Sequence, residues 1–196
     1  MPNVVDWIRD GHIGPLTGAA IPGGLPVEVS GGGCVQLAAT RILTGMEVEW
    51  VEGWTLPPKP GYRAPEAVLD TQADCPAWGR LGLSGGIICQ IGKPPDPPRN
   101  MCSSAVSGAE GQVWISPPQP VLVQGKGAEA TPISPEFFAA PRPADFFVPV
   151  IEQLMRACDS GGECECSGRD YLQALEIAVA LVQSAQRNHE RIKLPL

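Results

Sequence analysis

Three cysteines lie close together just before the last helical stretch of the chain. Cys158, Cys164 and Cys166 stand there beside Glu163 and Glu165. A structural zinc site takes four ligands, commonly from C-x2-4-C pairs or from one such pair and two histidines, and this spacing provides neither. We therefore interpret the stretch as a polar connection between helices and assign no metal ligand. The remaining cysteines are expected to be small buried apolar residues, at positions 34, 75, 89 and 102.

Histidines and carboxylates, the usual general acids and bases, are sparse or badly placed. His12 is expected in a surface loop, and His189 stands near the end of the last helix, where positive charge meets the negative end of the helix dipole. No Gly-x-Ser-x-Gly motif accompanies either histidine. Glu47, Glu49 and Glu52 share one exposed strand region, where nothing raises the pKa of one carboxyl as glycoside hydrolysis requires. We assign no catalytic residue.

The glycine triplet at residues 31–33 is a candidate for approaching a phosphate. A dinucleotide site needs glycines in a G-x-G-x-x-G pattern between a strand and a helix. The triplet lacks that context, so we predict no phosphate binding and assign no cofactor to this chain.

Composition narrows the class of protein. The chain has 196 residues, which suffices for one domain with a substantial core. Its formal net charge of −7 makes nucleic acid an unfavourable partner. No apolar stretch is long enough to span a bilayer, and residues 1–10 do not read as a secretory signal. Seven cysteines without regular spacing favour a reducing compartment, so we expect a soluble protein of the cytoplasm or a similar compartment.

The final thirty residues contain the clearest predicted element. Ser167 and Asp170 have the spacing of a capping box, which predicts a helix that begins near Gly168. Apolar residues then recur with a period of 3.6 and predict a core-facing stripe, made of Tyr171, Leu175, Ala178, Val182 and Ala185, with Leu172 and Val179 alongside.

The other elements are shorter and separated by loops rich in glycine and proline. Helices are predicted over residues 2–10 and about 145–158, the second with an apolar stripe. Strands are predicted over residues 47–54, 78–91 with a turn at 84–86, 112–116 and 121–124, and residues 125–143 are predicted to be loop. In the first strand, Glu47 and Glu49 should share one face, and Val48 and Trp50 the other. Most strand tryptophans are expected in the core, namely Trp50, Trp54, Trp78 and Trp114.

Several short motifs resemble the C-terminal domain of the Gfo/Idh/MocA oxidoreductases, over residues 4–196. The motifs are Asp10-Gly-His-Ile-Gly14, the run from Gly33 to Gly45 with Arg41, the Ser167-Gly-Arg-Asp170 start, Ala174-Leu-Glu-Ile-Ala178 and the terminal Lys193-Leu-Pro-Leu196. The resemblance implies an α+β fold, in which helices cover one face of an open, mostly antiparallel sheet. In this family the other face commonly forms a dimer interface. Alternating strands followed by helices predict the same layered class independently.

The resemblance also identifies what the sequence lacks. The Rossmann domain that binds NAD(P) in the family, and its Glu-Lys-Pro step, are not in this sequence. The polar Asp and His expected ahead of Arg41 are missing or replaced by Cys34, Val35 and Gln36. The resemblance implies five substrate-side candidates, Gly32, Gly33, Arg41, Arg63 and Asp70.

Three functions follow as hypotheses. The first is a non-catalytic binding or assembly domain, which forms a homodimer or binds a partner protein through the open sheet face. The second is the substrate-binding half of an NAD(P)-dependent sugar or polyol oxidoreductase, whose Rossmann half is on another chain or was lost by truncation. In that case NAD(P) is bound only through the Rossmann partner. The third is an unrelated α+β binding module.

Overall fold

The computed structural model of the protein describes residues 2–25, 32–57, 75–94, 104–115, 121–125, 131–133, 147–164 and 167–196. Within these ranges nine strands form one open sheet in the order β8-β7-β6-β5-β1-β4-β3-β2-β9. The strands β1 and β4 run parallel, and the other neighbouring pairs are antiparallel. The predicted α+β class with an open, mostly antiparallel sheet is thus confirmed. The strands are β1 (Leu16–Ile21), β2 (Val48–Thr55), β3 (Ala77–Leu83), β4 (Ile88–Ile91), β5 (Ser104–Gly108), β6 (Gly111–Ile115), β7 (Val121–Gln124), β8 (Thr131–Ile133) and β9 (Ile192–Lys193).

One face of the sheet is lined by a continuous row of buried side chains. Because successive residues of a strand point to opposite faces, residues paired directly across neighbouring strands share a face. The row crosses seven strands in register and forms the floor of the core. Its members are Val51, Leu81, Cys89, Ala19, Val106, Val113 and Leu122.

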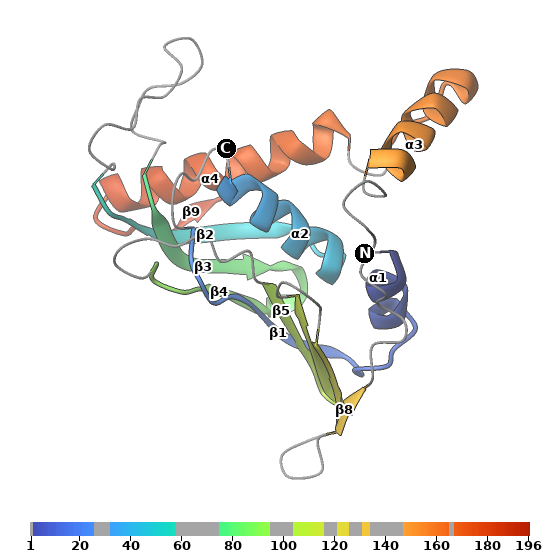
Figure 1. Ribbon diagram of the computed structural model, residues 1–196. Coiled ribbons are helices and arrows are strands. Elements are labelled where there is room, and N and C mark those ends of the chain that lie inside the picture. Colours follow the sequence, from blue (N-terminus) through green and yellow to red (C-terminus); the bar gives the residue numbers. More distant parts are fainter. Residues whose placement is uncertain are drawn as a thin grey trace.

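Three helices cover this face (Figure 1). They are α1 (Pro2–Arg9), α2 (Cys34–Thr44) and α4 (Gly168–Gln186). Helix α4 packs on β2 and β3, α2 packs on β1 and β5 beside α4, and α1 packs against α2. A main core therefore lies under α2 and α4, and a second lies between α1, the end of α2 and β5 to β7. We call this side of the sheet the helix side and the other the open face.

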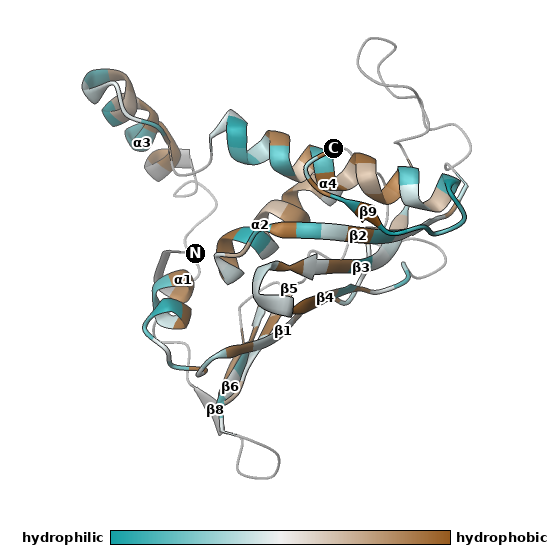
Figure 2. Ribbon diagram, turned by 180° about the vertical axis from the view of Figure 1, so that it is seen from behind, coloured by the Kyte–Doolittle hydropathy of each residue, from teal (hydrophilic) through white to brown (hydrophobic). Residues whose placement is uncertain are grey.

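The fourth helix, α3 (Phe147–Ser160), stands apart from this layer in both views (Figures 1 and 2). It has no substantial packing contact with any other described element. Its predicted position is confirmed to within a few residues, and Pro149 lies in its first turn, where the missing N–H costs no helical hydrogen bond. No helix in the described ranges has the length and apolarity needed to cross a membrane.

Helix α4 begins where the sequence predicts. The Ser167 hydroxyl accepts from the Asp170 N–H, and the Asp170 carboxylate accepts from the Ser167 N–H, so both halves of the capping box form. The predicted stripe is wrong at its first turn, since Tyr171 and Leu172 are 41% and 62% exposed. The sheet lies under the neighbouring stripe, which comprises Ala174, Ile177, Ala178, Leu181 and Ser184.

A close approach between β2 and α4 explains which side of α4 faces the sheet. A Cβ atom at Gly53 would collide with the backbone of Leu181, so only glycine allows α4 to lie this near the strand. The Ser184 hydroxyl accepts a 2.9 Å hydrogen bond from the Gly53 N–H. Backbone contact at Gly53 therefore sets which side of α4 is buried.

The predicted face of one β2 residue, Trp50, is wrong. The register between β2 and β3 shifts between Val48 and Trp50, which is a β-bulge at Glu49. The extra residue turns Val48 into the core, where it is 8% exposed, while Trp50 points to the open face. The sequence predictions also missed strands β5, β8 and β9, which are short. Strands β5 and β9 pair with the distant strands β1 and β2, whereas β8 pairs with its neighbour β7.

Candidate functional site

The N-terminal end of α2 carries two of the predicted substrate-side residues. Gly32 is exposed and Gly33 is buried, and Gly33 occupies the N-cap position of the helix. A glycine has no side chain that could accept from the first helical N–H groups, as a Ser, Thr, Asp or Asn cap does. The first turn of α2 therefore has no side-chain cap at Gly33, and this feature by itself defines no ligand site.

Gln36, in the first turns of α2, is the residue here with unused hydrogen-bonding capacity. It is 3% exposed, and among the described residues neither its amide oxygen nor its amide nitrogen has a hydrogen-bond partner. An unsatisfied buried polar group costs about 1 to 3 kcal/mol, so such groups need an explanation. In the sequence, Gln36 is notable only because it stands where the family pattern has an acid or histidine. The signal that could have identified it is a polar residue within the apolar run of a core helix.

Cys34, at the start of α2, is not a nucleophile in this setting. Its side chain is fully buried, and burial raises the pKa of the thiol to about 11, although a hydrogen bond with Tyr171 opposes the shift. Because the thiolate is the reactive form, this thiol is inert at neutral pH. Cys75 and Cys89 are buried as predicted, whereas Cys102 lies outside the described residues.

Arg41 binds structural partners. Its guanidinium donates to both carboxylate oxygens of Glu47, at 2.8 and 2.9 Å, and to the backbone oxygen of Asp170 at 3.4 Å. It therefore ties the end of α2 to the start of β2 and to the first turn of α4. The Asp170 carboxyl has a lowered pKa because the backbone and side chain of Ser167 donate to it.

The predicted candidates are not gathered at one point. Gly33 and Arg41 are separated by eight residues of α2, roughly 12 Å along the helix axis. Arg63 and Asp70 lie outside the described residues. The role of all five residues, Gly32 included, at a substrate stays a prediction.

The open face holds a charged cluster that the sequence analysis missed. Glu52 on β2 is 8% exposed, and its carboxylate accepts from Arg191 at 2.7 and 2.9 Å and from Arg80 on β3. Burial raises the pKa of the Glu52 carboxyl, but hydrogen bonds and charge from the two arginines outweigh it, so the pKa lies below its ordinary value. The arginines are 28 and 139 residues from Glu52 in sequence, too far for any local pattern to reveal them.

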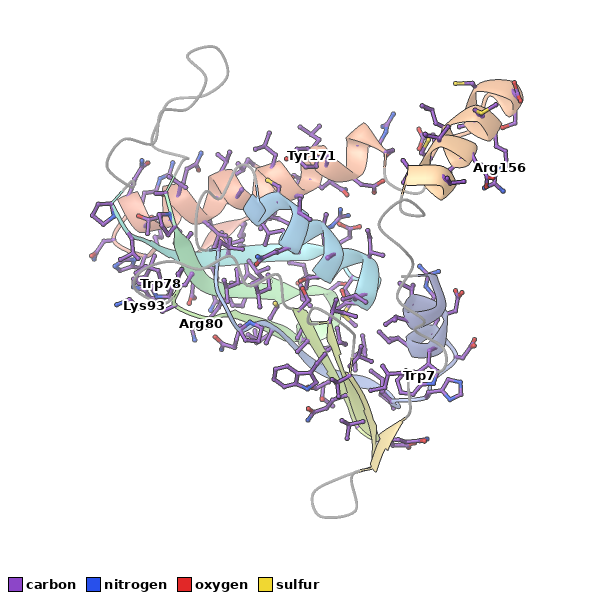
Figure 3. The ribbon with its side chains drawn as sticks, in the orientation of Figure 1. Trp7, Trp78, Arg80, Lys93, Arg156 and Tyr171 are labelled. Atoms are coloured by element: carbon purple, nitrogen blue, oxygen red, sulfur yellow. The ribbon has the colours of Figure 1, made fainter. Side chains whose placement is uncertain are left out.

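Three tryptophans on β2 and β3 flank this cluster, and Trp114 lies farther along the sheet on β6, which corrects the prediction that most of the four lie in the core. Trp50, Trp54 and Trp78 are half-buried, and Trp114 is 41% exposed. Trp78 alone of these four packs partly against the main core. In Figure 3, Trp78, Arg80 and Lys93 lie on the sheet side opposite to α4 and its Tyr171.

Cationic or polar side chains occupy the faces of three of these rings. The guanidinium carbon of Arg191 lies 3.7 Å from the Trp50 ring centroid, and Lys93 Nζ lies 5.5 Å from that of Trp78. His189 stacks on Trp54 with ring centroids 4.8 Å apart, and its Nδ1 lies 2.9 Å from the Gly53 carbonyl oxygen. Each of these contacts places a cationic or polar side chain against one face of a ring.

The described residues do not fit a metal ion or a dinucleotide. They contain no group of three or more His, Cys, Asp or Glu side chains placed to hold a metal, and Cys166 lies outside them. A dinucleotide-binding unit needs adjacent parallel strands joined by a helix. In the described sheet β1 is parallel only to β4, and α2 leads from β1 to β2, which is not its neighbour.

Comparison of the sequence with protein-family profiles and with curated proteins gave no match. Comparison with solved structures gave several matches. An aldose-aldose oxidoreductase from Caulobacter crescentus, complexed with glycerol, is 21% identical with a TM-score of 0.69, over 97% of this chain and 59% of its own. An oxidoreductase domain protein from Kribbella flavida is 16% identical with a TM-score of 0.71, over 100% of this chain and 62% of its own. A levoglucosan dehydrogenase, in complex with NADH and levoglucosan, is 15% identical with a TM-score of 0.70, over 98% of this chain and 62% of its own.

These likenesses establish the fold. Over nearly its whole length the chain has the fold of part of the Gfo/Idh/MocA-type oxidoreductases, consistent with their C-terminal domain. It spans between 59% and 62% of the length of the structures named above.

Proposed function

We propose that this chain is a binding and assembly domain, which associates through the open face of its sheet and does not catalyse hydride transfer alone. The observation that carries this proposal is an apolar pair on that face. Trp114 and Val121 are directly opposite each other on β6 and β7, and they are 41% and 48% exposed. Exposed tryptophan is more common at protein interfaces than on other surfaces.

The charged cluster supports the same proposal. Because Glu52 is buried between two arginines and the neighbouring rings are stacked, the open face presents a fixed surface. A fixed surface loses little conformational entropy when a second molecule binds to it. We expect the occupant to be a second copy of the chain or a partner protein.

The mass of the purified chain in solution tests this proposal. We expect light scattering to give twice the 20.7 kDa mass of one chain. Trp114→Asp should shift the mass to that of a monomer, because it places a charge in the middle of the buried interface. Leu154→Asp, the same kind of change on α3, is the matched control and should leave the dimer intact. A monomeric wild-type chain at micromolar concentration, or a Trp114→Asp dimer, contradicts self-association through this face.

A second function is favoured by Gln36 and by the fold. The solved structures named above include a dehydrogenase in complex with NADH and a sugar. The Gln36 amide, which no other described residue satisfies, can both donate to and accept from a sugar hydroxyl. In this function the chain is the substrate-binding half of an NAD(P)-dependent sugar or polyol oxidoreductase, and the nucleotide is held by a Rossmann domain outside residues 1–196.

Melting measurements and reconstitution test the second function. NAD(H) or NADP(H) should not raise the melting temperature of residues 1–196, whereas a bound ligand at a hundredfold excess over Kd adds about 2.7 kcal/mol of stability. A Rossmann partner should restore turnover on a panel of sugars and polyols. Gln36→Leu should then raise KM more than it lowers kcat, because the amide would bind substrate before and during reaction. Absence of turnover in the reconstituted pair rejects this function.

A further inference from the structure

Helix α3 carries an apolar side that no other described element covers. Its 14 residues make no substantial packing contact with the rest of the described chain. A helix of this length is marginal in water without tertiary packing, so its apolar side needs an occupant. Five large side chains on that side are 53% to 62% exposed, namely Val148, Val150, Ile151, Leu154 and Met155.

The apolar and charged residues divide α3 into two halves. At 3.6 residues per turn, the five exposed apolar residues and Ala157 fall on one half of the helix. The charged residues Glu152, Arg156 and Asp159 fall on the other half. A contact through the apolar half therefore leaves the charges in solvent.

The pattern of the apolar half reads the same from either end. It is centred between residues 152 and 153, so each apolar position has an apolar counterpart at the same distance on the other side of that centre. The paired positions are 148 and 157, 150 and 155, and 151 and 154. Such a surface is complementary to itself, as an isologous contact about a two-fold axis requires.

An antiparallel pair of α3 helices satisfies all of these positions at once. With the two-fold axis between residues 152 and 153, Ile151 of each copy lies level with Leu154 of the other, and Val150 lies level with Met155. Sliding one helix by a turn places Val150 level with Asp159 instead. The dipoles of two antiparallel helices also attract each other. The pattern therefore favours this register, and the dipoles favour this orientation.

We infer that α3 is a second self-association site, at which two copies of this chain pair their α3 helices in antiparallel orientation. The inference goes beyond the assembly function proposed above, because the open face joins two chains and α3 joins two such pairs. Two helices of 14 residues, each about 21 Å long, bury less than the roughly 1,200 Å² at the lower limit of a standard interface. The pairing is therefore weak, with a Kd on the order of 0.1 mM, and adds to the open-face dimer only at high concentration.

Sedimentation velocity tests the pairing, on the purified chain from about 5 μM to about 500 μM, a range that brackets this Kd. The Trp114→Asp background removes the open-face contact. In that background, Leu154→Asp should raise the Kd of the remaining association at least about tenfold, because it places a charge at the centre of the apolar contact. Arg156→Asp is the matched control. It introduces the same side chain on the charged half of α3 and should leave the Kd within about twofold.

Disulfide trapping tests the orientation. Ile151→Cys and Leu154→Cys are each combined with Cys158→Ser, which removes an exposed native thiol from α3. The two variants are mixed and oxidised with glutathione disulfide. An antiparallel pair should give the mixed disulfide in excess of the statistical proportion, whereas a parallel pair gives mainly the two homodisulfides. Mass spectrometry of the linked peptides measures the proportions.

Three outcomes overturn the inference. In the Trp114→Asp background they are a chain that stays monomeric up to about 500 μM, and equal association of Leu154→Asp and Arg156→Asp. The third is an excess of homodisulfides over the mixed product. If Trp114→Asp leaves the open-face dimer intact, the comparison of Leu154→Asp with Arg156→Asp still isolates the α3 contact. Failure of the proposed open-face association is thus distinguished from failure of the α3 pairing.

Discussion

Helices α3 and α4 have similar sequence patterns, but their apolar side chains differ in burial. Both are amphipathic, and both carry large apolar residues at helical spacing. In α4 the side chains of Ile177 and Leu181 are at most 2% exposed, because Gly53 lets the helix lie directly on β2. In α3 the corresponding side chains, among them Ile151 and Leu154, are more than half exposed.

The difference shows that an amphipathic pattern predicts a need for a partner without naming it. Helix α4 has a capping box, a close contact at Gly53 and a terminal strand β9 that pairs with β2. None of the other described elements packs substantially on α3. Helix α4 therefore contributes to the stability of this unit, and α3 should contribute little. Four substitutions test that division.

The largest effect is expected in the middle of α4. Leu181→Ala removes a side chain that is 0% exposed, and a cavity of this kind lowers the free energy of unfolding by about 2 to 5 kcal/mol. Chemical denaturation followed by circular dichroism measures the change. A loss below 1 kcal/mol, on the order of a surface substitution, would falsify the close packing of α4 on β2.

A smaller loss of stability is expected at Glu52, which binds Arg191 in the segment that follows α4. Glu52→Gln removes the charge that binds Arg80 and Arg191. Because both arginines are half-exposed and partly screened, we expect a loss of about 1 to 3 kcal/mol.

This loss depends on pH in a defined direction. The folded pKa of Glu52 is lowered from 4.5, so the contribution is fully present above the unfolded pKa and lost as pH falls through the folded value. The difference in unfolding free energy between wild type and Glu52→Gln should therefore shrink in acid below about pH 4.5. A difference that stays constant from neutral pH into strong acid contradicts the ion pairs.

The capping box should contribute about 1 kcal/mol. Ser167→Ala leaves the Asp170 N–H without its acceptor, and loss of an N-cap costs about 0.5 to 2 kcal/mol. Hydrogen exchange at the first turn of α4 should rise while exchange near Leu181 stays slow. Ser160→Ala, in the last turn of α3, is the control and should change the stability by less than about 0.5 kcal/mol.

The smallest effect is expected on α3. Leu154→Ala should change the unfolding free energy of the isolated chain by less than about 0.5 kcal/mol, since its side chain is 55% exposed. A loss of several kcal/mol in the isolated chain means that α3 packs on the body of the protein, and the contrast between the two helices then disappears.

The sheet shows where prediction from sequence succeeds and fails. The hairpin around Gly85 and Gly86 was predicted because a tight turn needs residues that tolerate positive φ, and both have φ of 78°. Strands β7 and β3 follow local patterns and were predicted as well. Strand β5 was missed, because its pairing with β1 joins residues about 90 positions apart. The bulge at Glu49 was missed because it depends on how β3 pairs with β2.

The site residues rest on less evidence than the fold, and their role at a substrate stays a prediction. Gly32, Gly33 and Arg41 were selected through a family resemblance, and the structure separates Arg41 from the glycines and binds it to Glu47. Gln36 was recorded only as a departure from the family pattern. Its importance as a candidate depends on its burial and its unsatisfied amide, which are properties of the folded chain.

The sequence by itself determined the start of α4, the presence of α3, the α+β class and the resemblance to part of an oxidoreductase fold. These follow from capping, periodicity and short motifs, which act between residues a few positions apart. Only the tertiary structure decided which stripe of α4 is buried, that Glu52 lies between two arginines, and that none of the other described elements packs substantially on α3. Those outcomes depend on contacts between segments as far apart as 139 residues, such as Glu52 and Arg191, and no local pattern contains that information.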